Sequence, residues 1–210
     1  MQSQSSGAVP QQARSIATRK KLLDAAARSL CSLGYAKITT TVIAHAAGVS
    51  QGALYKHFGS KHHLIAATAE HLCRGLVEDF RSAFADERAD EGQDQLPRLL
   101  RELWVVFLKP ELYALIELYI AARTDEPLRQ ALIPVMQEHR DNLIVEARRL
   151  FPEAAAHNPH FEIAVDGVMS ALQGAAMSAA VMQNPSRASD LSSFLEHLCR
   201  RELEPPYGVA

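Results

Sequence analysis

The sequence predicts an all-α protein, with a three-helix head at the N-terminus and a larger helical-bundle body behind it. Three observations predict this class. Apolar residues recur at helical spacing in most segments, no segment alternates convincingly at the period of two typical of strands, and Pro and Gly fall almost entirely between the periodic segments. We expect about nine helices. A chain of 210 residues, 48% of them apolar, is long enough to bury such a core.

A polar arm precedes the first helix. Residues 1–13 are polar and contain Gly and Pro, which is typical of a flexible arm. From Arg14, apolar residues recur at intervals of three and four, and Gly34 stands where a helix commonly ends. We expect this helix to be the first of three in a head of residues 14–64.

The other two helices of the head predict a helix-turn-helix at residues 39–58. Thr39 or Thr40 offers a cap for the first of them, and Gly48 supplies the positive-φ turn that joins it to the second. Ser50 opens the second helix as its cap. That helix carries small, polar, basic and aromatic side chains on one face, which is typical of a helix laid into the major groove of DNA.

The remaining segments predict a body of residues 65–203 and a tail of residues 204–210. Ser60 caps a long helix that runs to about Ala85 and links the head to the body. An acidic loop at 86–95 is followed by helical patterns at 96–108, 111–124, 125–151, 161–183 and 186–202, with a connection at 152–159. Pro134 is expected either to kink the third of these patterns or to split it into two helices.

Charge divides the chain at the same boundary. Residues 1–64 contain eight Lys or Arg and one acidic residue, Asp24, so their formal charge is +7. The remaining residues carry −9, and the whole chain −2. A basic head on an acidic body is typical of a module that meets a polyanion, joined to one that does not. Charge alone also allows a solvated basic face without a partner.

Other features favour a cytoplasmic protein without a membrane partner. The start, MQSQSSGAVPQQ, lacks the charged-then-apolar order of a secretory signal, and no apolar run approaches the ~18 residues that a membrane span needs. Cys31, Cys73 and Cys199 lie far apart in helical patterns and form no CxxC pair. We expect them to be reduced, buried thiols.

The head resembles a known family. The segment LLDAAARSLCSLGYAKITTTVIAHAAGVSQGALYKHFGSKHHLIAA, residues 22–67, is similar to the head of the TetR family of bacterial transcriptional regulators. The resemblance is carried by Gly34-Tyr35, Ile43-Ala44, Ala47-Gly48-Val49-Ser50, Gly52-Ala53-Leu54-Tyr55, His57-Phe58, Ser60-Lys61 and Leu64. Ile38 departs from the pattern, since the family often has threonine there, and the acidic residue usual early in the second helix is absent. The resemblance implies a homodimeric regulator whose body binds a small effector.

Ten residues of the head are expected to contact double-stranded operator DNA. They are Thr39, Thr40, Ser50, Gln51, Gly52, Ala53, Tyr55, Lys56, His57 and Lys61. Gln51 can form two hydrogen bonds to an adenine base, and the Ala53 methyl can contact a thymine methyl. Lys56 can donate a hydrogen bond to guanine or to a phosphate.

Phosphate contacts are implied by the resemblance for a subset of these residues. The members are Tyr55, His57, Lys61 and the hydroxyl of Thr39 or Thr40. Two helices are expected to start at Ser50 and Ser60. The positive end of each helix dipole would favour an anion there. The alternative is that Tyr55 is a packed aromatic and His57 a satisfied core histidine.

Two later segments predict a dimer interface. In 161–183, small residues repeat every three or four positions, which lets another helix approach closely. In 186–202, apolar residues form a seam. The candidate interface residues are Gly167, Ala171, Gly174, Ser178, Leu191, Phe194, Leu195 and Leu198. A four-helix interface between two chains would present two heads to a palindrome, and the alternative is that the stripe packs within its own body.

The body also supplies candidates for an effector pocket, whose existence rests mainly on the resemblance. They are Trp104, Phe107, Tyr113, Tyr119, Arg123, Met136, His139, Met169, Gln173 and Met177. Such residues at helical spacing are more often plain core. A small, largely apolar effector is expected.

Two further kinds of function were weighed against DNA binding. Gly48-Val49-Ser50-Gln51-Gly52 matches the nucleophile elbow of a serine hydrolase, but that elbow needs a strand before the serine. His57, His62, His63 and His71 lie near Cys73 without the spacing of a zinc site. We therefore expect no catalytic residue, no metal and no cofactor. A ligand-responsive repressor is the leading hypothesis, and a DNA-binding protein that senses no effector is the other.

Overall fold

The computed structural model describes residues 11–85, 96–182 and 185–203, and every element in these ranges is helical. The predicted all-α class is therefore confirmed. The described elements are α1 (Gln11–Leu33), η1 (Tyr35–Lys37, a 3-10 turn), α2 (Thr40–Ala47), α3 (Gln51–Phe58), α4 (Lys61–Ala85), α5 (Leu96–Phe107), α6 (Pro110–Ala122), α7 (Glu126–Leu150), α8 (Pro152–His157), α9 (Phe161–Met182) and α10 (Pro185–Leu203).

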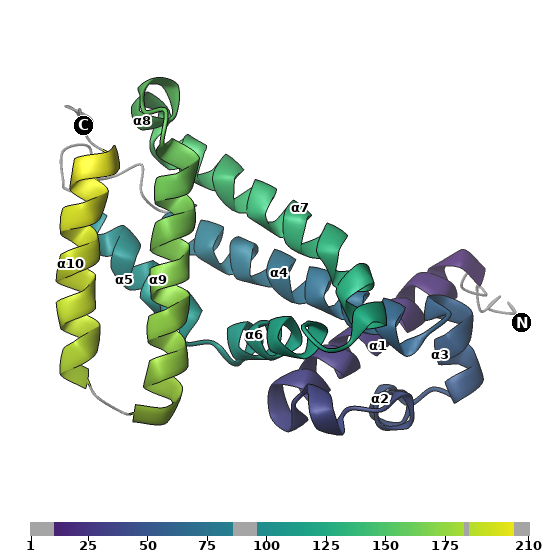
Figure 1. The fold of residues 1–210 in the computed structure, drawn as a ribbon. Coiled ribbons are helices and arrows are strands. Elements are labelled where there is room, and N and C mark those ends of the chain that lie inside the picture. The colour runs from purple at the N-terminus through teal and green to yellow at the C-terminus, as the bar shows by residue number, and fades with distance from the viewer. Residues whose placement is uncertain (1–10, 86–95, 183–184, 204–210) are drawn as a thin grey trace, which may run out of the picture.

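The molecule is elongated, with different helices at its two ends (Figure 1). The head, formed by α1 to α3, lies at one end, and the pair α9 and α10 stands at the other. Between them α4 and α7 run side by side, and these two helices make the most extensive contact of any pair. Since α4 begins in the head and ends in the body, it forms a continuous connection between the two ends.

Apolar side chains gather in two clusters. The first contains the head residues Leu22, Ile43 and Leu54, and it continues through α4 into α6 and α7, where Leu118 and Leu128 belong to it. The second is built from the far half of the molecule, including residues of α5, α7, α9 and α10. The first cluster therefore joins the head to part of the body, and it does not stop at the expected boundary after residue 64.

The helices differ from the sequence expectations at two places. The first helix begins at Gln11, three residues inside the expected arm. The expected connection at 152–159 contains a short helix, α8, which starts at a proline in its first turn. Pro134 lies inside α7 without splitting it, so of the two alternatives left open by the sequence the division into two helices is wrong. The described ranges hold ten α-helices, one more than expected. The acidic loop, the tail and residues 1–10 of the arm lie outside the described residues.

Helix α9 requires a correction to the membrane expectation. Among the described helices it alone is long and apolar enough to cross a membrane by length and composition, with a mean hydropathy of 1.2 over eighteen residues. Its Ala, Val and Met residues raise the mean although Glu162 and Asp166 interrupt the sequence. Only 22% of the segment is buried, so α9 exposes much of its apolar surface.

Candidate nucleic-acid interface and ligand chamber

Caps and a left-handed glycine create the turn between α2 and α3. The Thr39 hydroxyl caps α2 by accepting a hydrogen bond from the Val42 amide at 3.2 Å. Gly48 ends α2 in the left-handed region at φ 66°, which favours glycine. Ser50 then caps α3 by accepting from the Ala53 amide at 3.2 Å. The predicted helix-turn-helix thus has its turn and both caps in place.

The helix that precedes Ser50 argues against the hypothesis of a serine hydrolase. Ser50 follows the helix α2, whereas a nucleophile elbow places its serine after a strand. Its hydroxyl oxygen accepts the capping bond from Ala53. The residue is therefore placed to start a helix.

Helix α3 is anchored by one face and open on the other. Leu54 is fully buried and Phe58 nearly so, which fixes the helix against the head core. The opposite face exposes four of the predicted DNA contacts, and two more are half-buried beside them. The exposed residues are Gln51, Gly52, Tyr55 and Lys56, and the half-buried ones are Ala53 and His57. A row of polar and basic side chains is thus held on a fixed helix.

Hydrogen bonds tie this open face to the start of α2. The Tyr55 hydroxyl lies 3.3 Å from the hydroxyl of Thr40, and the Gln51 amide donates to the hydroxyl of Thr41. Thr41 was not among the predicted contacts, although it continues a run of three threonines. Because Gln51 is bonded within the protein, it must exchange this partner to reach a base edge.

Lys61 lies at the first turn of α4. Its ammonium nitrogen sits 4.7 Å from the centre of the Tyr35 ring, a cation–π distance. Ser60 caps α4 by accepting from the His63 amide at 3.1 Å. The positive end of the α4 dipole and the Lys61 side chain therefore lie near each other.

The histidines considered as metal ligands are placed apart, and two of them have carboxylate partners. His62 lies 3.5 Å from Asp125, and His71 lies 3.3 Å from Asp24. The described residues contain no group of three His, Cys, Asp or Glu that could hold a metal ion. The three cysteines are free thiols, of which Cys73 and Cys199 are buried.

Polar contacts join the head to the body. The Tyr35 amide donates to Glu117 on α6 at 2.8 Å, and the Tyr35 hydroxyl donates to Asp125, the cap of α7, at 3.0 Å. Burial, together with this bond to Asp125, raises the pKa of Tyr35 to about 12. The amide of Leu128, and then Tyr35 and His62, hold the pKa of Asp125 below its ordinary value. No local pattern predicts this junction, because its members are 82 and 90 residues apart in the chain.

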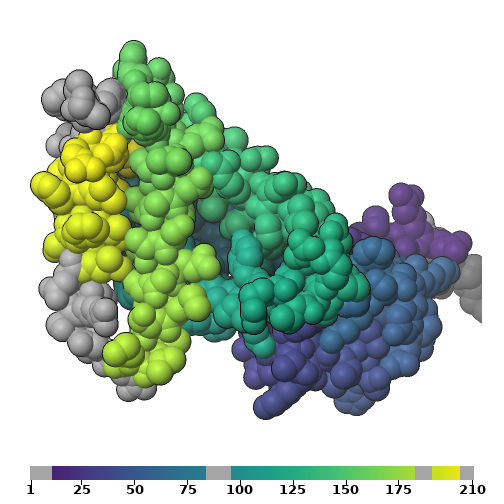
Figure 2. All heavy atoms as spheres, viewed as in Figure 1, coloured from purple at the N-terminus to yellow at the C-terminus, as the bar shows by residue number. Residues whose placement is uncertain are grey.

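The second apolar cluster encloses a chamber. Its empty space is about 890 Å³, counting the part open to solvent. The surface is hollowed between α9 and α7 (Figure 2). The lining includes Leu76 and Phe80 of α4, Leu103 of α5, Leu143 of α7 and Val168 of α9. The walls thus combine helices that are distant in the sequence.

Three of the ten residues expected in the effector pocket line this chamber. They are Phe107, His139 and Met169. The other seven, which do not line it, are Trp104, Tyr113, Tyr119, Arg123, Met136, Gln173 and Met177. Tyr119 and Arg123 are exposed near the end of α6, a helix that packs against α1, α4 and α7. Most of the lining is Leu and Val, which the sequence reading treated as ordinary core.

Glu146 is a carboxylate in the chamber wall, and it is the one charged residue that is buried among the described residues. Arg81 of α4 donates to one of its oxygens from Nε at 2.7 Å, and Arg149 donates to the other at 3.1 Å. Burial raises the pKa of Glu146, but the two arginines outweigh burial and hold the pKa below its ordinary value. The carboxylate is therefore ionised and ties α4 to α7. The sequence reading missed it.

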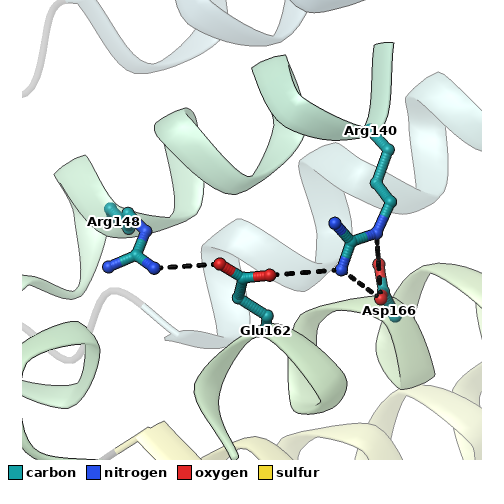
Figure 3. Close-up of polar contacts among 4 residues, drawn as sticks. All are labelled: Arg140, Arg148, Glu162 and Asp166. Carbon is teal, nitrogen blue, oxygen red and sulfur yellow. Dashed lines mark hydrogen bonds and ion pairs between the residues drawn. The ribbon is translucent and has the colours of Figure 1, made fainter. Parts of the chain in front are cut away.

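A second group of ion pairs joins α7 to α9 near the chamber (Figure 3). Arg140 donates to Asp166 at 2.8 Å and also reaches Glu162 at 3.3 Å. Arg148 donates to the other oxygen of Glu162 at 2.9 Å. These side chains are all partly exposed, so each pair contributes little alone. Together they connect the α7 and α9 walls.

Helices α9 and α10 leave apolar side chains uncovered. On α9, Ile163 is 72% exposed and Val181 82%, and on α10 Phe194 is 62% exposed. Among the predicted interface residues, Gly167, Gly174, Ser178 and Phe194 are exposed, while Ala171, Leu191 and Leu198 are half-buried. Leu195 is fully buried in the second cluster, so its inclusion in the interface was wrong. The four predicted residues of α10 lie on one face of the helix, and only the structure shows that this face turns from the exposed Phe194 to the buried Leu195.

The comparisons with known proteins agree with this architecture. The model of the family described as bacterial regulatory proteins, tetR family, matches residues 22–68. The uncharacterized HTH-type transcriptional regulator Rv2912c of Mycobacterium tuberculosis is 33% identical over 175 residues, which is 83% of this chain and 89% of the relative. The HTH-type transcriptional regulator BetI of Brucella anthropi is 29% identical over 134 residues, 63% of this chain and 68% of the relative.

Solved structures share the fold. A TetR transcription regulator from Haloarcula marismortui superimposes with a TM-score of 0.69 at 19% identity, covering 90% of this chain and 100% of the other. The multidrug binding protein EbrR, solved with imidazole, gives a TM-score of 0.65 at 21% identity, covering 86% of this chain and 93% of the other. The likeness to Rv2912c extends through most of both chains, beyond the head. The chain therefore belongs to the TetR family of helix-turn-helix transcriptional regulators, which is not a family of enzymes.

Proposed function

We propose that this DNA-binding regulator is a ligand-responsive repressor that acts in the cytoplasm and binds a palindromic operator as a homodimer. The observation that carries the proposal is the course of α4. This helix starts beside the recognition helix α3, and its far half forms a wall of the chamber through Leu76, Val77 and Phe80. A molecule in the chamber thus touches the helix that positions the head.

The proposed DNA contacts divide into base readout and phosphate contacts. Gln51 and Lys56 lie on the exposed face of α3 and have the donors for adenine and guanine edges, with Gly52 and Ala53 allowing close approach. The phosphate contacts are Tyr55, His57, Lys61, Thr39 or Thr40, and the amide ends at Ser50 and Ser60. Lys61 leaves the Tyr35 ring to make its contact.

The proposed dimer interface is the exposed face of α9 and α10. It combines the small residues Gly167 and Gly174, which allow close helix approach, with the uncovered apolar side chains Ile163, Val181 and Phe194. The pair stands at the end of the molecule away from the head, so two copies joined there leave both recognition helices free (Figure 1). Two heads then reach successive major grooves of one operator.

Sedimentation of a Phe194→Glu variant tests this interface. The wild type is expected to sediment as a dimer at micromolar concentration and the variant as a monomer, because a charge would be buried against apolar surface. Val105→Glu is the matched control, since Val105 is an exposed apolar residue on α5 outside the face. A monomeric wild type would remove the interface from the proposal.

The proposed effector is a small molecule whose larger part is apolar, as the chamber lining requires. EbrR shares the fold and was solved with ethidium and with proflavin, so small ligands can be held in a body of this architecture. Effector binding would favour a spacing of the heads that no longer fits two grooves, with a coupling of about 1–3 kcal/mol. We keep the expected division into a head of residues 14–64 and a body of residues 65–203 as part of the proposal.

Footprinting on the DNA that flanks its own gene tests operator binding. A protected palindrome with half-sites about one or more helical turns apart supports a dimeric repressor. A screen for compounds that raise the melting temperature and release this DNA then tests the effector. If the palindrome is protected and no compound releases it, the alternative of a DNA-binding protein without an effector is favoured.

A further inference from the structure

Four charged side chains form a row of ion pairs across the seam between α7 and α9 (Figure 3). We call them the strap, and they are Arg140 and Arg148 of α7 and Glu162 and Asp166 of α9. Glu162 is shared, because its two oxygens accept from different arginines. Since α7 supplies both positive charges and α9 both negative ones, the strap attracts one helix to the other.

The strap crosses the outside of the chamber. Arg140 follows the lining residue His139, and Asp166 follows the lining residue Val165. Successive residues of a helix point about 100° apart, so a side chain next to a lining residue can project to the outer surface. The four side chains of the strap are accordingly 42–49% exposed. They lie on the side where the surface is hollowed between α9 and α7 (Figure 2).

The seam that the strap crosses is the lesser contact of each helix. The backbones of α7 and α9 approach each other over a smaller area than those of α4 and α7, or those of α9 and α10. The two helices meet beside α8 and diverge from there (Figure 1). Near this vertex, Arg148 also lies 5.7 Å from the ring centre of Phe161. The pair of Arg140 and Asp166 is farther from the vertex, where a separation of the helices would begin.

The strap is charged but weak. Hydrogen bonds from Arg148 and then from Arg140 hold the pKa of Glu162 below its ordinary value. Hydrogen bonds to Asp166 and Glu162 raise the pKa of Arg140. The strap is therefore ionised at neutral pH. Ion pairs this exposed are individually weak, so thermal motion breaks and remakes them.

We propose that the strap is a gate of the chamber. While its pairs are made, α9 is held against α7 and the chamber is closed on this side. When they break, the seam widens and a ligand enters or leaves. This inference rests on the proposed function, because access matters only if the chamber holds an effector. The gate sets the rate of exchange rather than the affinity, since no member of the strap lines the chamber.

The thiol of Cys199 can report access to the chamber without any ligand. Cys199 lines the chamber from α10 and is 2% exposed, so a reagent reaches it only after the structure opens. N-ethylmaleimide is added to the full-length protein, and the labelled fraction of each cysteine is followed by mass spectrometry of its peptide. Cys73, which is buried in the first cluster, is the internal control in the same samples.

Arg140→Glu is the test variant, because it places a carboxylate opposite Glu162 and Asp166. We expect Cys199 to be labelled about tenfold faster in this variant, since two weak attractions become repulsions and the open state is more populated. The labelling rate of Cys73 should stay unchanged. The double variant Arg140→Glu/Asp166→Arg rebuilds the pair in reverse, and it should return the rate to within about twofold of the wild type.

Salt and a matched variant sharpen the test. Added salt screens exposed charges, so it should speed the labelling of Cys199 in the wild type and slow it in Arg140→Glu. Arg129→Glu is the control, because Arg129 is 51% exposed, pairs with Glu126 within α7 and lines no part of the chamber. Its labelling rates should match those of the wild type.

Three results would overturn the gate. An unchanged rate in Arg140→Glu would indicate entry by another route, such as the outer face of α9 and α10, where Cys199 borders a further hollow. Faster labelling of Cys73 as well would show that the variant loosens the whole fold. Faster labelling of Cys199 that the reversed pair does not restore would show that the attraction is not its cause.

The outcomes also separate the gate from the proposed function. If labelling of Cys199 responds to the strap as expected but no compound releases operator DNA, the gate stands and the ligand-responsive mechanism fails. If a compound releases operator DNA but the labelling does not respond to the strap, the mechanism stands and the gate fails.

Discussion

The head and the far half of the body bury their apolar side chains in different ways. Nine of the largest fully buried side chains of the described residues lie in the first cluster, and Leu195 is the one apolar member of that group in the second. The second cluster surrounds a chamber, and its members are mostly a few per cent exposed. The filled core holds α3 in one position, and the hollow core leaves room for a ligand.

This difference matches the two tasks proposed for the protein. A recognition helix must present its side chains in fixed register with the base pairs, so it benefits from dense packing. A ligand-binding body benefits from a core with an empty space. A ligand that fills this space changes the packing of the helices around it and so favours one conformation of the body. The following four predictions test the contrast, from the largest expected effect to the smallest.

Truncation of a core leucine should cost more in the head than at the chamber. We expect Leu54→Ala to lower the free energy of unfolding by about 2–5 kcal/mol, as for a fully buried leucine. Leu103→Ala should cost less, because one side of Leu103 already faces empty space and has fewer atoms in contact. Urea unfolding of both variants measures the difference. Equal costs would show that the head is not more tightly packed.

Gly34 and Gly48 offer a matched test of the contact between head and body. Both have positive φ, 76° and 66°, so an alanine at either position is strained by about 1–2 kcal/mol. A Cβ on Gly34 would in addition lie 2.8 Å from the Glu117 carboxylate, whereas one on Gly48 meets nothing within 4 Å. Thermal unfolding should therefore show a larger loss for Gly34→Ala. The excess should vanish in a Glu117→Ala background, and its persistence would argue against this contact.

Substitutions on the open face of α3 should affect DNA binding without affecting stability. We expect Gln51→Ala or Lys56→Ala to weaken operator binding by about 1–3 kcal/mol and to relax specificity at one base position. Lys61→Ala should weaken all sequences alike. Mobility-shift titrations on operator variants distinguish the two patterns, and an unchanged affinity for Lys56→Ala would contradict the base contact.

Acid should destabilise the body through His139, and we expect this effect to be the smallest. Burial lowers the pKa of His139 below its ordinary 6.5, so the unfolded chain takes up the proton at a higher pH than the folded protein. Stability is then full above the unfolded pKa and falls as the pH drops below it. The melting temperature of His139→Gln should decline less than that of the wild type between about pH 8 and about pH 5.5. Parallel curves would show that His139 does not contribute.

Features that depend on interactions between nearby residues were predictable from the sequence, and features that depend on distant residues were not. The helix-turn-helix was predictable because Thr39, Gly48 and Ser50 each act within three or four residues of their own position. The chamber was largely missed because Leu103, Leu143 and Val168 come from three helices, and leucine in a wall looks in sequence like leucine in a filled core. For the same reason the apolar seam of α10 was assigned to the interface although Leu195 faces inward.

The sequence by itself determined the all-α class, the family and the open face of the recognition helix. The class and the open face depend on helical periodicity, on caps and on a turn glycine, which are local properties of the chain, and the family follows from the resemblance of residues 22–67. Only the tertiary structure decided where the second core is left hollow, that Glu146 is tied to Arg81 across 65 residues, and that Tyr35 joins the head to α6 and α7. Such features depend on the distances between helices, which are set by the packing of the whole chain and are absent from any single segment.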